Sequence, residues 1–111
     1  MENYEFETLV GFTIKNKLKY VSNEIVIKYI LKNKTGTVMV MAVDFGKIYN
    51  PEPSNHSTFI LVLEGKAEIV VDEVPTFLQN DDAMIIPGDT IYTIEANEKF
   101  KMLYIILNNK I

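Results

Sequence analysis

The stretch GKIYNPEPSNHSTFILVLEG, residues 46–65, decides the fold. Its second half, residues 58–63, is rich in β-branched and aromatic side chains and predicts a strand. Its first half contains Pro51 and Pro53, which prevent regular strand pairing. The stretch therefore predicts an irregular, polar loop that runs into a buried strand and ends at a glycine turn.

On either side of this stretch, short apolar segments alternate with turn residues. β-Branched and aromatic residues favour strands, whereas Gly, Pro, Asn and Asp favour the turns between them. This pattern predicts strands at residues 24–31, 37–44, 58–63, 66–71, 74–78, 83–86, 91–94 and 100–107. Short strands at spacings of about 8–12 residues predict an all-β barrel or jelly roll. The beginning of the chain is ambiguous: residues 8–14 fit a strand, and residues 6–10 fit one helical turn.

Length and composition set the class of protein. A chain of 111 residues predicts one domain, residues 1–111, and 48% hydrophobic with 23% charged residues is a globular composition. A net charge of −4 and the lack of arginine argue against nucleic-acid binding. The lack of cysteine excludes disulfides and thiolate metal sites. No apolar run is long enough for a membrane span, and the polar N-terminus is no signal peptide, so we expect a cytoplasmic protein.

The polar residues of the decisive stretch have a regular spacing. Five residues separate Gly46 from Glu52, and Ser54 and Thr58 follow before six residues lead to Gly65. This frame resembles the first motif of the cupin family: a glycine, five residues, His-x-His, three or four residues, a glutamate, six residues and a glycine. The chain keeps both glycines and replaces the metal-ligating side chains between them.

A second frame centres on Pro87. It resembles the second cupin motif: a glycine, five residues, Pro-x-Gly, two residues, a histidine, three residues and an asparagine. Of these, only the proline is present, and the remaining motif positions are occupied by Asp81, Asp89, Tyr92 and Ala96. The resemblance covers about residues 24–107 and implies a double-stranded β-helix, the jelly-roll barrel of the cupins.

The resemblance also implies a homodimer, because family members commonly pair through apolar sheet faces. The predicted strand 100–107 has apolar residues on both faces. One face is expected to fill the barrel, and the other to pack on a second sheet or a second subunit.

The family's metal is held by three imidazoles and one carboxylate, donors that suit Mn, Fe, Ni or Zn. Here the four matching positions hold Glu52, Ser54, Thr58 and Tyr92. Hydroxyl groups and a phenol are poor ligands for such ions near neutral pH. His56, the one histidine, shares the parity of residues 52, 54 and 58, although the prolines before it weaken this argument. The sequence therefore predicts no metal and no cofactor.

Glu52, Ser54, His56, Thr58 and Tyr92 are the candidate pocket residues. For His56 the alternative is an exposed residue at the beginning of a strand, with no role. For Tyr92 the alternative is a core tyrosine whose hydroxyl bonds to the backbone, and for Glu52 a solvated loop carboxylate.

Three functions remain open. The first is a metal-free barrel, without enzymatic activity, that binds a small apolar or mixed-polarity molecule or acts as a dimeric interaction module. The second is a metal-independent acid–base isomerase or epimerase, with His56 as base, Tyr92 as acid and Glu52 as orienting group. The resemblance supports it, because metal-free sugar epimerases of similar fold use a histidine base and a tyrosine acid. The third is a metal-dependent cupin dioxygenase or isomerase.

Overall fold

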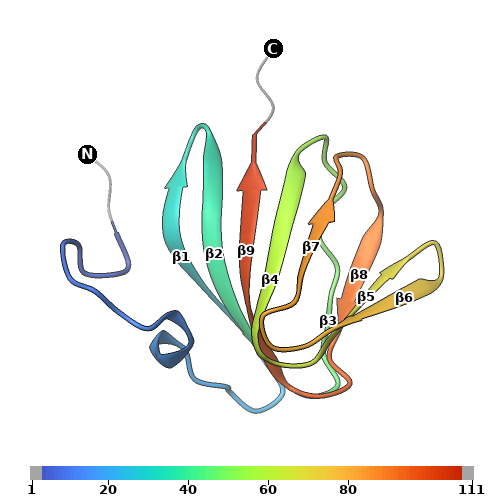
Figure 1. Ribbon diagram of the computed structural model, residues 1–111, viewed down its shortest axis with the longest axis horizontal. Helices are drawn as coiled ribbons and strands as arrows, with labels where there is room; N and C mark the ends of the chain where they lie inside the picture. The colour runs from blue at the N-terminus through green and yellow to red at the C-terminus, as the bar shows by residue number, and fades with distance from the viewer. Residues whose placement is uncertain (1–3, 109–111) are drawn as a thin grey trace.

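Two antiparallel sheets face each other and enclose the core (Figure 1). The computed structural model describes residues 4–108. The first sheet has the strand order β1 (Ile25–Asn33), β2 (Gly36–Val43), β9 (Phe100–Leu107), β4 (Ser57–Gly65) and β7 (Ala83–Ile86). The second sheet has the order β3 (Ile48–Tyr49), β8 (Tyr92–Glu95), β5 (Ala67–Val71) and β6 (Val74–Leu78). This arrangement confirms the predicted all-β jelly roll.

The predicted strands are found, with ends that differ by no more than two residues. Strand β3 is a short addition inside the proline-containing segment, which otherwise forms no regular structure, as Pro51 and Pro53 require. The two interpretations of the N-terminal segment, a strand at 8–14 or a helical turn at 6–10, are both wrong. Leu9 has φ of 63°, a left-handed conformation that fits neither element. A 3₁₀ helix, η1 (Ile14–Lys17), follows instead.

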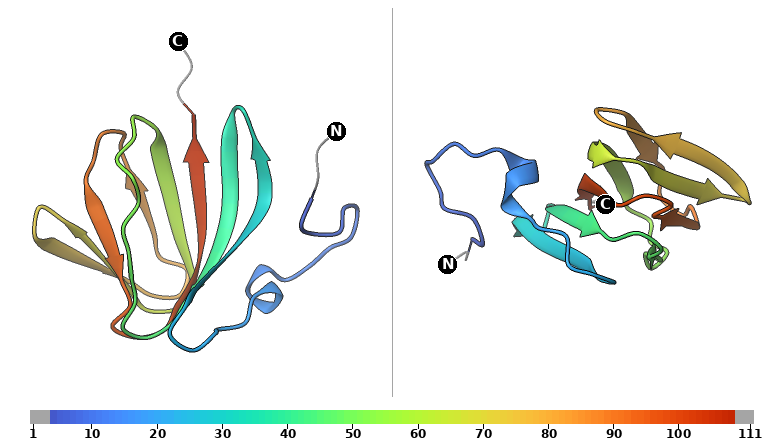
Figure 2. Two further views of the ribbon diagram at one scale, coloured as in Figure 1. Left: turned by 180° about the vertical axis from the view of Figure 1, so that it is seen from behind. Right: turned by 90° about the horizontal axis from the view of Figure 1, so that it is seen from below.

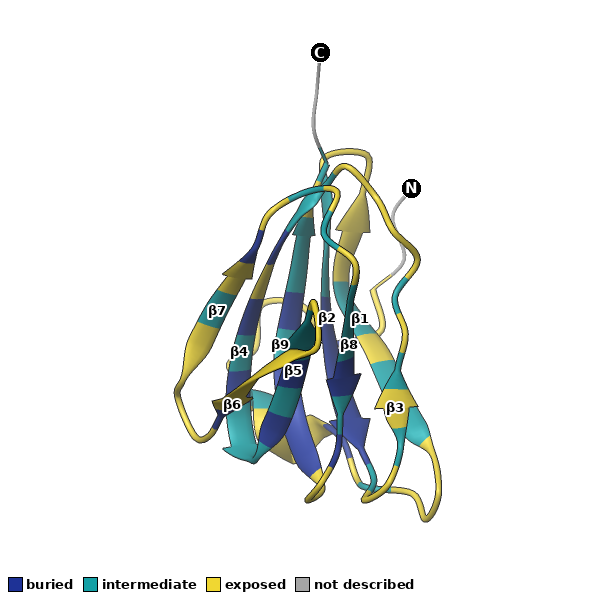
Figure 3. Cartoon of the chain, turned by 90° about the vertical axis from the view of Figure 1, so that its right-hand side faces the viewer, coloured by how far each residue is buried: buried dark blue, intermediate teal, exposed yellow. Residues whose placement is uncertain are grey.

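The core lies between the sheets and is built from alternate side chains of each strand. Phe100, Met102 and Tyr104 of β9 point inward and are at most 2% exposed. They pack with β2 and β4 side chains of the same sheet, and with Ile69 and Ile94 of the facing sheet. Buried residues alternate with less buried ones along much of β4 (Figure 3). The period of two is the pattern expected for strands with one face in a core.

The N-terminal segment covers part of the outer face of the first sheet (Figure 2). Phe6 and Leu18 form a second apolar cluster with Val40 and Ala42 of β2, which point away from the main core. The sequence predicted that a second sheet or a second subunit would cover this face. Within one chain, the N-terminal segment covers the area over β2, and a second subunit on the outer side of β9 stays a prediction.

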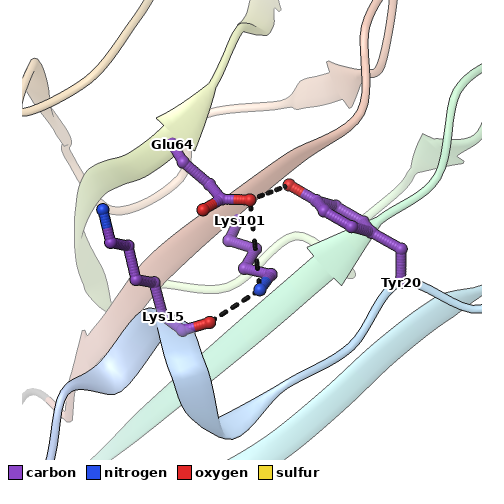
Figure 4. Close-up of polar contacts among 4 residues, drawn as sticks. All are labelled: Lys15, Tyr20, Glu64 and Lys101. Carbon is purple, nitrogen blue, oxygen red and sulfur yellow. Dashed lines mark hydrogen bonds and ion pairs between the residues drawn. The ribbon is translucent and has the colours of Figure 1, made fainter.

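Polar contacts fix this segment to the sheet (Figure 4). Lys101 of β9, only 9% exposed, donates from Nζ to the carbonyl of Lys15 at 2.6 Å. The Tyr20 hydroxyl donates to Glu64 Oε2 at 2.8 Å, and Lys101 Nζ lies 3.9 Å from the same oxygen. Burial, with the adjacent Glu64, raises the pKa of Tyr20, so this donor keeps its proton. Within the described part of the chain, no helix is long and apolar enough to cross a membrane.

Candidate functional site

A cavity of about 300 Å³ opens between the sheets beneath residues 50–56. All the candidate residues from the sequence line it: Glu52, Ser54, His56, Thr58 and Tyr92. The remaining lining residues are Tyr49, Pro51, Ile86, Pro87, Thr90, Tyr104 and Ile106. The structure therefore brings the two sequence frames together around one space.

The loop over the cavity is fastened to the turn that follows β7. The backbone N–H of Asp89 donates to the Ser54 carbonyl at 2.7 Å. Gly88 permits this contact, because a Cβ at that position would collide with the backbone of Asn55. The backbone N–H of His56 donates to Ser54 Oγ at 3.1 Å, which tightens the loop locally.

The loop residues lie at different depths. Glu52 and Ser54 are exposed and mark the mouth of the cavity, whereas Thr58 is buried at its base. His56 is half-buried, so its interpretation as an exposed residue is wrong. Residues 52, 54, 56 and 58, which share a parity in the sequence, all line this cavity although residues 50–56 form no strand.

Tyrosines form the inner wall of the cavity. Tyr92 of β8 and Tyr104 of β9 share a hydrogen bond between their hydroxyl groups, which joins the two sheets. The ring of Tyr49 meets that of Tyr104 edge to face, with 5.9 Å between centroids and an angle of 88°. Sequence reasoning did not name Tyr104 as a pocket residue, because its strand has apolar residues on both faces and neither face was assigned to the barrel interior. Tyr49 had no detectable signal, because it lies in a two-residue strand.

The tyrosine hydroxyls keep their protons near neutral pH. Burial raises the pKa of Tyr104, and the hydrogen bond to Tyr92 raises it further. Burial also raises the pKa of Tyr92, against the lowering effect of hydrogen bonds with Tyr104 and Thr58. The pKa of Tyr49 is likewise raised by burial. The inner wall is thus an uncharged set of hydroxyl donors and acceptors on apolar rings.

Solved structures share this architecture over the full chain. A conserved protein of unknown function from Streptococcus pyogenes superposes with a TM-score of 0.90 at 16% identity, covering 99% of this chain and 98% of that one. A cupin superfamily protein from Desulfitobacterium hafniense superposes with a TM-score of 0.89 at 19% identity, covering 98% and 100%. The chain has the cupin fold.

A further cupin, the conserved barrel domain protein from Leptotrichia buccalis, superposes with a TM-score of 0.83 at 23% identity and covers 87% of this chain and 47% of that one. No family model matches the sequence. A search of curated proteins likewise gives no significant match. The likeness to the cupins is one of fold.

The cupin fold commonly carries a transition metal, which needs several imidazole and carboxylate donors around one point. Among the residues that line it, His56 is the only imidazole and Glu52 the only carboxylate. Across residues 4–108, no three His, Cys, Asp or Glu side chains gather into a group that could hold a metal. Ser54, Thr58 and Tyr92 supply hydroxyls at the remaining motif positions. This donor set does not fit a cupin metal centre.

Proposed function

We propose that this cupin barrel binds a small organic molecule in the tyrosine-lined cavity without a transition metal. The observation that carries the proposal is the convergence of residues from both frames on one open-mouthed cavity, at the contact between the loop and the turn after β7. Cavities of this kind, apolar with a few convergent polar groups, are the usual form of small-molecule sites.

The wall chemistry supports a ligand of mixed polarity. Ile86, Ile106 and the tyrosine rings supply apolar surface. The hydroxyls of Thr58, Tyr92 and Tyr104 are already hydrogen-bonded to one another, so they add polar contacts without a charge. A ligand is therefore held by shape and by a small number of hydrogen bonds.

A fragment screen followed by protein NMR tests the proposal. Ligands should shift the amide signals of the cavity strands in the wild type but not in Ser54→Trp, whose indole would fill the mouth. Pro53→Trp is the matched control, because Pro53 is exposed and adjacent in the loop but does not line the cavity. Fragments that bind both variants equally, or none that bind the wild type, would refute the proposal.

The metal-free part of the proposal has its own measurement. Elemental analysis of the purified protein should find far less than one equivalent of Mn, Fe, Ni or Zn per chain, even after these ions are supplied during growth. If the wild type held a near-equimolar ion and Glu52→Ala or His56→Ala removed that ion, the metal-free proposal would be overturned and the metal-dependent cupin enzyme favoured.

A second candidate function, metal-independent acid–base isomerisation, is favoured by one observation. His56 and Tyr92 line the same cavity, and the raised pKa of Tyr92 keeps its hydroxyl protonated as a proton donor. Such an enzyme would exchange a carbon-bound substrate proton with solvent. In deuterated water, a panel of hydroxyketones and sugars should then gain deuterium with the wild type and not with His56→Gln. A lack of exchange across the panel favours the binding module.

We also propose that the barrel is a homodimer. The outer face of the first sheet carries a row of apolar side chains on neighbouring strands, where Ile85 of β7 pairs with Phe59 of β4, which pairs with Ile105 of β9. Ile85 is 71% exposed in the single chain. A second copy would cover this row, which lies beyond the area that the N-terminal segment protects.

A further inference from the structure

The formal charge of the cavity lining is negative. Among the residues that the structure describes, Glu52, at the mouth, is the only carboxylate in the lining. Among the described residues that line the cavity, none is a lysine, and the chain has no arginine at all. Apart from the single imidazole of His56, an anionic ligand would therefore meet no basic side chain in this space, beneath an acidic mouth, on a molecule with a net charge of −4.

The aromatic wall favours a positively charged ligand. The rings of Tyr49 and Tyr104 stand nearly perpendicular and form an aromatic corner. Tyr92 adds a third ring, held by its hydrogen bond to Tyr104. Aromatic rings attract cations through their quadrupole, and clustered rings are the usual means of holding ammonium groups. Since the phenols of Tyr92 and Tyr104 are hydrogen-bonded and the ring of Tyr49 packs on that of Tyr104, this wall is fixed before any ligand arrives.

We infer that the cavity selects a small organic ammonium ion, whose cationic end lies between the aromatic corner and the Glu52 carboxylate. The inference rests on the proposed function, since it names the class of molecule that the binding site takes. A volume of about 300 Å³ suits a ligand of amino-alcohol to small aromatic-amine size. Thr90, which also lines the cavity, offers a hydroxyl to a polar group of such a ligand.

Three probes of one shape and different charge test the inference by NMR titration. They are choline, its uncharged carbon isostere neohexanol, and the anion tert-butylacetate. Choline should bind at least about tenfold more tightly than neohexanol, as expected when aromatic rings and a carboxylate act together. Binding of tert-butylacetate should be undetectable over the same concentration range.

Single-residue variants test whether the selectivity for choline arises in the cavity. Glu52→Gln should weaken choline by about threefold and leave neohexanol unchanged, because an exposed ion pair contributes modestly. Glu98→Gln, which removes the same charge from an exposed position outside the cavity, should change neither. Ser54→Trp should abolish the choline-induced shifts.

The outcomes separate this inference from the proposed function. If neohexanol or tert-butylacetate binds as tightly as choline, or if fragments occupy the cavity while choline does not, the ammonium inference is wrong and the binding site stands. If Glu98→Gln weakens choline as much as Glu52→Gln, the selectivity comes from the overall charge, and the inference also fails. If no fragment binds the wild type, the proposed function fails as well.

Discussion

Four backbone positions of the two frames share an unusual conformation. Gly46 and Gly65 have φ of 86° and 84°, and Asp81 and Asp89, which occupy the glycine positions of the second cupin motif, have φ of 70° and 65°. Aspartate tolerates this left-handed region better than most residues. Aspartate therefore replaces glycine at two positions of the second motif, and the backbone there is still left-handed. Because these turns stand at the motif spacing, the spacing could predict the fold although most motif residues differ.

Gly65 should be the most sensitive of these positions. A Cβ there would collide with the Lys99 carbonyl and with Phe100, and the left-handed conformation adds strain. Gly65→Ala is expected to lower the free energy of unfolding by more than about 2 kcal/mol in urea denaturation. Gly11→Ala is the control, because its Cβ would meet no atom within 4 Å. Equal effects of the two substitutions would contradict the structural role of Gly65.

The tyrosine pair should show strong coupling. Either Tyr92→Phe or Tyr104→Phe removes one hydroxyl and leaves its partner short of a hydrogen bond, at an expected cost of about 1–3 kcal/mol in the free energy of unfolding. The double variant should cost less than the sum of the two, because no hydroxyl is then left without this partner. Additive losses in a double-mutant cycle would show that the two hydroxyls do not interact.

The same pair predicts a loss of stability in alkali. A phenol whose pKa is raised by folding holds its proton more tightly in the native state than in the unfolded state. Its contribution to stability is complete below the unfolded pKa of about 10 and falls as the pH rises above that value. Urea unfolding at pH values on either side of 10 should show a steeper loss for the wild type than for the Tyr92→Phe/Tyr104→Phe variant. If both proteins lost stability equally with rising pH, groups other than this tyrosine pair, for example the lysines, would cause the loss.

The N-terminal segment is the element that sequence reasoning could not place. Its apolar residues follow neither a strand nor a helix period, because it is held by single side chains such as Leu18 and by the buried Lys101, not by regular pairing. The barrel strands, by contrast, were predictable because each is a short β-branched or aromatic segment bounded by turn residues. Four residues of the cavity lining, Glu52, Ser54, Thr58 and Tyr92, could be named from the motif spacing and His56 from its parity, whereas Tyr49 lies in a two-residue strand that leaves no pattern in the sequence.

Leu18 should anchor this segment. It is 2% exposed against Val40 and Ala42, and Leu18→Ala is expected to cost about 2–4 kcal/mol of unfolding free energy in urea denaturation. Leu9→Ala is the matched control, since Leu9 is fully exposed in the same segment and should change stability by less than about 0.5 kcal/mol. If Leu18→Ala left the free energy of unfolding unchanged, the segment would not be packed on the sheet in solution.

At the scale of the whole molecule, the proposed dimer depends on the apolar row of the first sheet. Light scattering coupled to size exclusion should give twice the chain mass for the wild type and one chain mass for Ile85→Lys, because a buried, unpaired charge opposes association. Val74→Lys is the control: Val74 is 65% exposed, but it lies on β6 of the other sheet. A monomeric wild type, or a dimer that Ile85→Lys leaves intact, would exclude this face.

The clustering of tyrosines around the cavity has a practical consequence. The chain contains no tryptophan, and Tyr49, Tyr92 and Tyr104 are half of its six tyrosines. Its ultraviolet emission therefore comes from phenol rings alone, and a large share of those rings surround the space that a ligand would fill. Intrinsic fluorescence should report occupancy without any label, and an indole placed at residue 54 would act as an energy acceptor for the neighbouring rings.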